Sequence, residues 1–390
     1  MLRKLLIGVA VIATLVAGVG TARLVLPTDP TPGVVKQLTY LRAEIEAGAD
    51  HAAQQQFPEG YFFLNALYGL TWVQVGLADP SRAVDATREA RWALDRLKSP
   101  DGTAVFDASL RPKYGVFHAG WTNWLRAGLI ALKQSDAAEI DEFTSASVEL
   151  ATAFRTARTP YLQAYPGQAW PVDSTVAIAS LSAYDELVAP RFGATTARWV
   201  AAVKTKLDPG TGLMPHQATP ETTGARGSSQ SIIQRFLVEI DPAFARAQYE
   251  TFRDRFVTRL GVREYPKGVG GPGDVDSGPL ILGLSLSATV VTLGAAVVQH
   301  DPLAGRLARQ GELLGLPLTG LTTKRYAFGL MPIGDAFLAW SRSARPLVAA
   351  EQPELEGGSG WWRVPWLVVL WLPALLLWSL VRFRRSRRRH

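Results

Sequence analysis

The sequence predicts an all-α fold: an (α/α)6 toroid of six helical hairpins, with an N-terminal and a C-terminal transmembrane helix. Three features of the 390-residue chain predict it. Apolar, small-residue-rich segments alternate with charged amphipathic ones, the apolar segments start 47 to 57 residues apart, and an uncharged run of 18 residues lies near each end. Helices that are apolar all round suit an inner ring, and helices with one charged face suit an outer ring.

The two ends predict membrane attachment. Residues 1–25 hold an apolar run, 5–22, behind Arg3 and Lys4, and form either a cleaved signal peptide or a signal anchor. Residues 361–382 are long enough to span a bilayer as a transmembrane helix. Residues 383–390 are a basic tail, which the positive-inside rule assigns to the cytoplasm. The bulk of the chain, residues 34–346, is therefore expected outside, at the membrane of a bacterial cell envelope.

The overall basic charge belongs to this membrane topology. Ten of the 41 Lys and Arg residues lie at the two ends, which leaves 31 against 34 acidic residues in the middle. We therefore expect the membrane lipid bilayer as a partner and no nucleic acid. The chain has no cysteine, which excludes disulfides, a thiol nucleophile and cysteine-bound metal.

The elements follow in order. Residues 26–33 read as a proline-rich linker and 34–55 as an amphipathic helix. The apolar helices are expected to begin near Tyr61, His118, Asp173, Ser229, Asp276 and Met331. Their charged partners are expected at 81–98, 137–157, 194–207, 242–260 and 302–314, with short strands at 103–106 and 213–216 and a tether at 347–360.

Residues 277–299 hold no charged side chain and could be taken for a third span. They are rich in Gly, Ser, Thr and Ala, lack aromatic residues at their ends, and are flanked by Asp276 and Asp301. A third span would also move the arginine tail outside. We therefore predict a helix buried inside the domain, over residues 279–298.

The loops that enter the apolar helices should gather at one end of the toroid. The glycine-rich segment 270–279 brings Asp274, Asp276 and Ser277 to one such helix start, and Trp170 to Ser174 brings Asp173 to another, before a helix at 175–183. Loops on a rigid scaffold are where function usually lies.

This layout resembles the six-hairpin toroids, which include many glycoside hydrolases and polysaccharide lyases, and also the linalool dehydratase-isomerase type. The resemblance covers about residues 34–345 and rests on the hairpin alternation, on the segment Asp208 to Pro215 before an apolar helix, and on the Asp-Ser helix starts. It implies the fold and a polar cleft at one end. The dehydratase type has an active site associated with cysteines, which this chain lacks, and no specific glycosidase motif is present.

Asp173 and Asp276 are the predicted catalytic pair. Inverting glycosidases place an acid and a base about 6.5–9.5 Å apart, and opposite helices of a toroid could hold two carboxyl groups in this way. The alternative is that both side chains cap their helices.

Further residues near the helix starts are candidates for substrate binding. Aromatic rings can stack on sugars, a histidine can transfer protons near neutral pH, and charged loop residues can bind hydroxyl groups. The candidates are Glu59, Tyr61, His118, Trp121, Trp170, His216, Arg226, Gln230 and Asp274. Asp274 and Asp276 have the D-x-D spacing that can hold Mg²⁺ or Ca²⁺, but we predict no metal and no cofactor.

These features predict a membrane-tethered protein that hydrolyses or cleaves an envelope glycan or glycolipid by carboxylate acid–base chemistry. Two alternatives stay open from the sequence: a non-catalytic envelope binding or scaffold protein, and an enzyme for terpenoid or other apolar ligands with the dehydratase-like layout.

Overall fold

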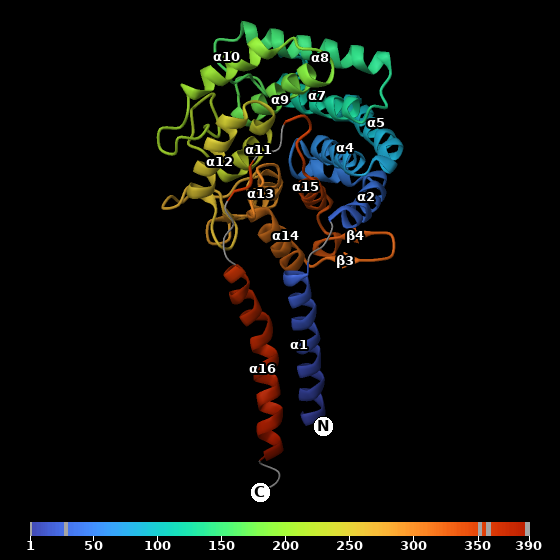
Figure 1. Ribbon diagram of the computed structural model, residues 1–390, viewed down its shortest axis with the longest axis vertical. Helices are drawn as coiled ribbons and strands as arrows, with labels where there is room; N and C mark the ends of the chain where they lie inside the picture. The colour runs from blue at the N-terminus through green and yellow to red at the C-terminus, as the bar shows by residue number, and fades with distance from the viewer. Residues whose placement is uncertain (1, 27–29, 350–352, 356–359, 387–390) are drawn as a thin grey trace.

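The computed structural model describes residues 2–26, 30–349, 353–355 and 360–386 (Figure 1). Within these ranges the chain forms sixteen α-helices and two small antiparallel sheets of two strands each. The prediction of a mostly helical protein is confirmed. Figure 1 shows a helical body from which two long helices project on one side.

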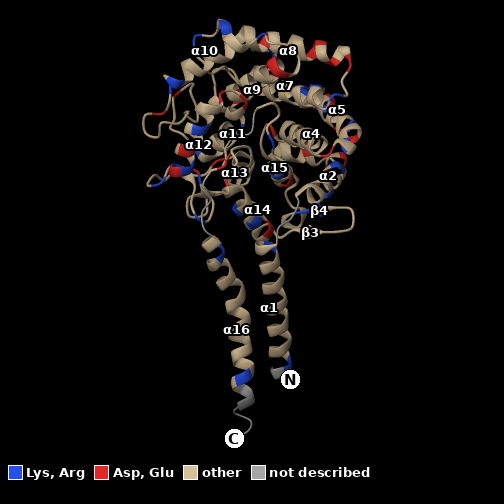
Figure 2. Cartoon of the chain, in the orientation of Figure 1, with Lys and Arg blue, Asp and Glu red and all other residues tan. Residues whose placement is uncertain are grey.

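The projecting helices are α1 (Leu2–Val25) and α16 (Val364–Ser386). Segments Lys4–Val25 and Gly360–Phe383 are long and apolar enough to cross a membrane, as predicted for both ends. The two helices pack against each other. Figure 2 shows almost no charged residue along them, whereas charges are spread over the helical body. The apolar helix Leu286–Val298 lies in the body and is too short to be a third membrane span.

Six largely buried helices occupy the middle of the body. Each contacts the next in chain order, and the last contacts the first. They are α4 (Gly60–Ala78), α7 (Gly115–Ala131), α9 (Pro171–Leu187), α11 (Gly227–Phe236), α13 (Leu286–Val298) and α15 (Pro332–Arg342). Their aromatic side chains meet at the centre: the Trp121 ring lies 5.4 Å from those of Phe63 and Phe236 and 5.7 Å from that of Trp340. This aromatic centre is a solid core rather than a channel.

Six more charged helices pack around the first set, as Figure 1 shows. They are α2 (Pro30–Glu46), α5 (Ala83–Lys98), α8 (Ala137–Thr156), α10 (Gly193–Lys204), α12 (Pro242–Phe256) and α14 (Leu303–Leu314). Short elements complete the body: α3 (Ala49–Gln56), α6 (Pro100–Thr103), β1 (Val262–Arg263), β2 (Leu284–Ser285), β3 (Leu318–Thr319) and β4 (Lys324–Arg325).

Several predicted boundaries were wrong. The helix expected at 34–55 is two helices, because Gly48 adopts a left-handed conformation (φ 91°) that ends α2 and lets α3 turn away. The expected linker 26–33 is already helical from Pro30, and residues 27–29 lie outside the described chain. The segments expected as strands at 103–106 and 213–216 are turns and loops, with Thr103 ending α6.

The largest correction concerns the helix expected at 279–298. It begins only at Leu286, capped by Ser285, whose hydroxyl accepts the Ala288 N–H (3.1 Å). Before it the chain makes a tight turn at Leu282 and Gly283, both at positive φ, and returns as β2 to pair with β1. Asp276 and Ser277 therefore lie in a loop and do not cap α13.

The segment expected as a free tether, 347–360, partly lies on the body. Buried Glu239 accepts the backbone N–H groups of Leu347 (2.6 Å), Val348 (3.2 Å) and Ala349 (2.9 Å). Leu355 donates its N–H to the His300 carbonyl (3.1 Å). Residues 350–352 and 356–359 lie outside the described chain. A buried carboxylate needs such donors, which explains why the chain is held here.

Candidate functional site

Three carboxyl groups from distant parts of the chain meet at the starts of the inner helices. Glu59 directly precedes α4, Asp173 lies in the first turn of α9, and Asp276 lies in the loop before β2. Burial, followed by the charges of Glu59 and Asp276, raises the pKa of Asp173 well above its ordinary value of 3.8. Since charges interact in this way only at close range, the three groups form one cluster, here called the acidic mouth.

Asp173 is the buried member of the acidic mouth. It is only 4% exposed, and its carboxyl group has no hydrogen-bond partner among the described residues. The start of α9 has Trp170 as its capping residue and carries no side-chain capping bond. Capping therefore does not account for this side chain. Burial without a donor favours the protonated form of a carboxyl group, so Asp173 is suited to donate a proton.

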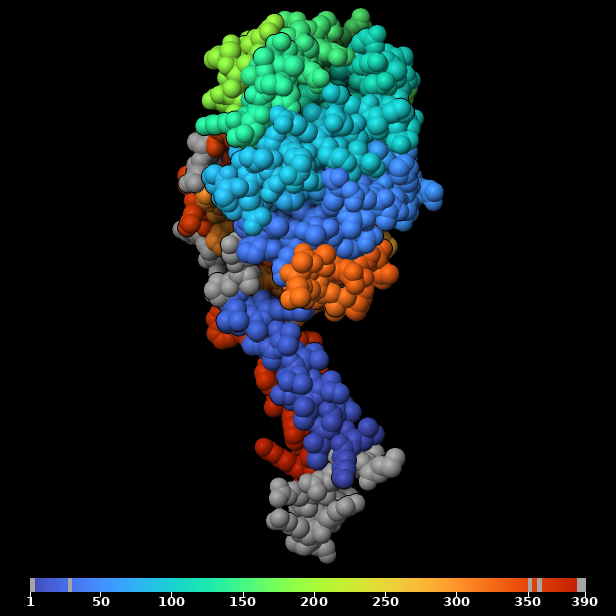
Figure 3. Space-filling view, turned by 90° about the vertical axis from the view of Figure 1, so that its right-hand side faces the viewer, coloured from blue at the N-terminus to red at the C-terminus, as the bar shows by residue number. Residues whose placement is uncertain are grey.

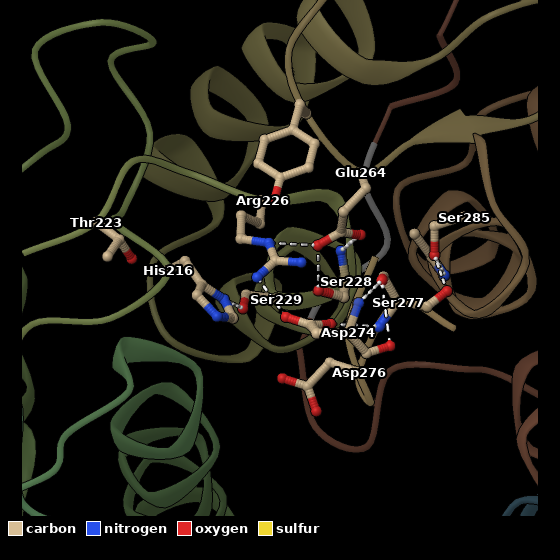
Figure 4. A network of polar contacts seen from close by, with 12 residues as sticks. His216, Thr223, Arg226, Ser228, Ser229, Glu264, Asp274, Asp276, Ser277 and Ser285 are labelled. Carbon is tan, nitrogen blue, oxygen red and sulfur yellow. Dashed lines mark hydrogen bonds and ion pairs between the residues drawn. The ribbon is translucent and has the colours of Figure 1, made fainter. Parts of the chain in front are cut away.

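Asp276 is the open member. The residue is exposed, but its carboxyl group is crowded by protein, and burial together with the charges of Asp274 and Glu59 raises its pKa to about 6. In Figure 4 its side chain points away from the neighbouring ion pairs and makes no marked contact. At pH 7 most of this group is ionised, so it can accept a proton. The two acids thus have environments suited to opposite roles.

An ion-pair network holds the loop that carries Asp276 (Figure 4). Arg226 Nε lies 2.8 Å from Glu264, and its Nη1 pairs with Asp274. Glu264 also accepts the Ser228 hydroxyl (2.7 Å) and N–H (3.1 Å), which ties the loop to the start of α11. Arg226 lowers the pKa of Asp276, which opposes the burial effect. Because Asp274 is engaged with a cation, the D-x-D pair is not arranged as a metal site.

Arg226 also has a free donor. Its Nη2 is buried and has no hydrogen-bond acceptor within the described chain. A buried guanidinium nitrogen without a partner is costly unless a ligand or water satisfies it. This atom is therefore an unsatisfied donor close to Asp276.

Tyr165 and Trp170 form an aromatic wall beside the acidic mouth. The Tyr165 hydroxyl donates to Glu59, and burial followed by the Glu59 charge raises its pKa. The Trp170 and Tyr165 rings meet edge to face at 6.0 Å. Glu59 is thus fixed by a neutral phenol.

His216 lies near Arg226 and is buried. Its Nδ1 is 2.5 Å from the Ser229 hydroxyl in α11, and burial with the Arg226 charge lowers its pKa to about 4. The imidazole is therefore neutral at pH 7 and holds its loop against α11.

Four predicted binding residues are buried among other side chains. Tyr61 packs against His51 and Arg96, and His118 contacts the Leu97 carbonyl (3.2 Å) with a pKa that burial lowers to about 4. Trp121 belongs to the aromatic centre, and Gln230 donates to the Met214 carbonyl (2.7 Å). Their contacts make them parts of the core.

Glu264 was not among the sequence candidates, although it is central to the network. It is a single acid in a short polar loop, 38 positions from Arg226, and nothing in its local sequence distinguishes it from a solvated charge. A shallow groove of about 600 Å³ lies elsewhere, on the outer wall, and includes Lys98, Arg126 and Glu142. It contains none of the acidic-mouth residues.

No protein-family model matches the sequence, and a search of curated proteins found no match. Fold and site therefore define the class only broadly. This is a mostly helical protein with two candidate membrane-spanning helices and a cluster of carboxyl groups at the starts of its inner helices.

Proposed function

We propose that the body is an (α/α)6 toroid and that the protein is a membrane-tethered hydrolase of an envelope glycan or glycolipid. The closed order of contacts among the six inner helices supports the toroid. The arginine tail supports an extracytoplasmic body, because positive charge flanking a span stays in the cytoplasm.

The observation that carries the reaction is the pair of unpartnered carboxyl groups, Asp173 and Asp276, with opposite environments. In the proposed step, protonated Asp173 gives its proton to the glycosidic oxygen of the leaving sugar. Ionised Asp276 takes a proton from the water that attacks the anomeric carbon. Arg226 Nη2 donates to a sugar oxygen, and Trp170 offers a ring face for stacking. The products are two sugars with free hydroxyl groups, and both acids end in the opposite protonation state.

The test is turnover by the full-length protein in detergent against a panel of soluble and lipid-linked envelope glycans, with products read by mass spectrometry. Hydrolysis adds one water to the products, whereas a lyase yields an unsaturated sugar. Asp173→Asn and Asp276→Asn should each lower kcat about 10²- to 10⁴-fold, because each removes one proton transfer. The melting temperature should not fall, since neither carboxyl accepts a hydrogen bond.

Asp95→Asn is the matched control, because Asp95 is an exposed carboxylate on α5 and should leave turnover unchanged. Turnover that survives in both variants would overturn the assigned roles. Binding of a glycan without any product would favour a non-catalytic binding protein instead.

A further inference from the structure

Four exposed leucines lie at the end of α14 and in the segment that follows it. Leu314, Leu316, Leu318 and Leu321, here called the hairpin leucines, are 54%, 51%, 41% and 96% exposed. Single exposed apolar residues are normal on proteins, but four within eight residues form a patch. They surround β3 and the turn to β4, a hairpin that Figure 3 shows in orange directly beside the top of the two projecting helices.

Contacts with α1 fix the depth of this segment. The Leu313 side chain lies 3.3 Å from where a Cβ on Gly20 would be, and Gly20 belongs to the apolar part of α1. Arg23 donates to the carbonyls of Glu312 and Pro317, each at 3.4 Å. The end of α14 therefore reaches the level of the membrane-spanning segment, and the hairpin leucines begin there.

The backbone gives a second, independent observation. Leu316, Phe328 and Leu282 have φ values of 48°, 60° and 54°, in the left-handed region where glycine, asparagine or aspartate is usual. Phe328 and Leu282 are 57% and 81% exposed. Neither the backbone conformation nor water favours a large apolar side chain at these positions. An apolar environment outside the protein would favour these exposed side chains, whereas the φ values are independent of the surroundings.

The apolar surface continues from the hairpin to the acidic mouth. Phe328, Leu330 and Met331, which are 57%, 80% and 55% exposed, directly precede α15. Helix α15 contacts both α4 and α13. The ring of Phe63 in the first turn of α4 lies 5.5 Å from that of Phe337 in the middle of α15, so α15 lies directly beside the helix that Glu59 precedes.

On the other side of the acidic mouth, the loop before α13 repeats this pattern. Val275, between Asp274 and Asp276, is 65% exposed, and Ile281, Leu282 and Leu286 are 72%, 81% and 69% exposed. Apolar side chains therefore flank the carboxyl groups on the part of the body that adjoins the membrane helices. A cleft that binds only sugar does not require these exposed apolar side chains, here called the apolar border.

We propose that the hairpin leucines enter the outer leaflet and that the substrate is a membrane-embedded amphiphile. Its lipid chain runs along Phe328, Leu330, Leu282 and their neighbours, and its polar head reaches Asp173 and Asp276. The choice of substrate rests on the proposed hydrolase function, whereas the lipid contact of the hairpin does not. The occupant of the apolar border is thus a lipid chain from the bilayer in which the protein is anchored.

The lipid contact can be measured because the chain has no cysteine. Leu321→Cys gives a unique thiol, which is labelled with bimane on the full-length protein in phosphatidylethanolamine and phosphatidylglycerol vesicles. Spin-labelled acyl chains should quench this probe at least twofold. Val84→Cys is the matched control, since Val84 is 68% exposed on α5, away from the projecting helices in Figure 1, and should not be quenched. Equal quenching at both positions, or none at Leu321→Cys, overturns the lipid contact.

The substrate class is tested with Leu330→Asp. Its kcat/KM for a lipid-linked glycan should fall at least tenfold, while its turnover of the same glycan without lipid stays at the wild-type level. Equal effects on both substrates, or none, overturn the amphiphile proposal and leave the hydrolase intact. A wild-type protein that cleaves neither substrate refutes the hydrolase instead, and the quenching result still decides the lipid contact.

Discussion

The acidic mouth and the cluster around Glu312 differ in whether their buried carboxyl groups have hydrogen-bond and ion-pair partners. Glu312 accepts hydrogen bonds from Lys324 (2.7 Å), the Tyr326 hydroxyl (2.6 Å) and Arg342. These partners, Arg342 first, outweigh burial and lower the pKa of Glu312 to about 2. Within the described ranges, the carboxyl groups of Asp276 and Asp173 have no hydrogen-bond partner, and burial raises the pKa of both. A buried carboxylate whose oxygens all have partners, here called saturated, holds helices together. A carboxyl group without partners can still bind a ligand or a proton.

The largest effect should come from breaking the saturated cluster. Glu312→Gln leaves Arg342 and Lys324 nearly buried without their common counter-charge, and it should destabilise the protein by about 3–5 kcal/mol. Thermal or denaturant unfolding of the full chain in micelles measures this. Asp276→Asn, made in parallel, should cost little. If both changes cost the same, the distinction between the two clusters is wrong.

The sequence predicted the helical scaffold well where helices alternate in character. It placed the starts of five apolar helices within a few residues, because turn-forming residues and a change in charge mark those boundaries. It failed at α13, because residues 277–299 carry no charged residue, and their scattered Ser and Thr give no periodicity that separates a turn from a helix. The turn at Leu282 and Gly283 was missed because leucine is not a typical turn residue and a single glycine is tolerated within a helix.

The sequence predicted several residues at and beside the acidic mouth, among them its carboxyl groups, Arg226 and Trp170. Glu59 and Asp173 lie at helix starts and Asp276 follows a glycine-rich segment, and these local patterns marked all three as candidates. Which aromatic and histidine side chains face the same space depends on helix rotation and on distant partners. His118 illustrates this, since its contact with the Leu97 carbonyl 21 positions earlier turns it into a core residue.

The pH dependence of stability should separate the two clusters by sign. Asp276 has a folded pKa of about 6 against an ordinary 3.8, so the folded state binds more protons and stability falls as pH rises between about 4 and 6. Glu312 has a folded pKa of about 2 against 4.5, so its contribution is complete above about 4.5 and is lost as pH falls towards 2.

Melting temperature measured from pH 2 to 7 tests both signs. Asp276→Asn should reduce the decline above pH 4 and leave the acid limb in place, while buried Asp335, whose pKa is raised to about 7, keeps part of that decline. Glu312→Gln should reduce the acid limb alone. A decline above pH 4 that is unchanged in size in both Asp276→Asn and Asp173→Asn would show that the acidic mouth does not contribute to it.

The smallest effect concerns a third set of paired polar groups, between the two projecting helices. Trp371 Nε1 donates to the Thr21 hydroxyl (2.9 Å) and Trp378 Nε1 to that of Thr14 (3.0 Å), so two matched bonds tie α1 to α16. Each threonine also donates to the carbonyl four residues earlier, which saturates its hydroxyl. Because their polar atoms all have partners, as in the Glu312 cluster, these bonds are structural. Their strength is limited, since separated helices in a membrane find other hydrogen-bond partners.

A double-mutant cycle of Thr21→Val and Trp371→Phe should give a coupling free energy of about 0.6 kcal/mol between the two side chains. Thr21→Val with Trp366→Phe is the control, since Trp366 makes no such bond within the described chain, and the two changes should be additive. Coupling of the same size in the control would mean that tryptophan packing, and not the hydrogen bond, joins the helices.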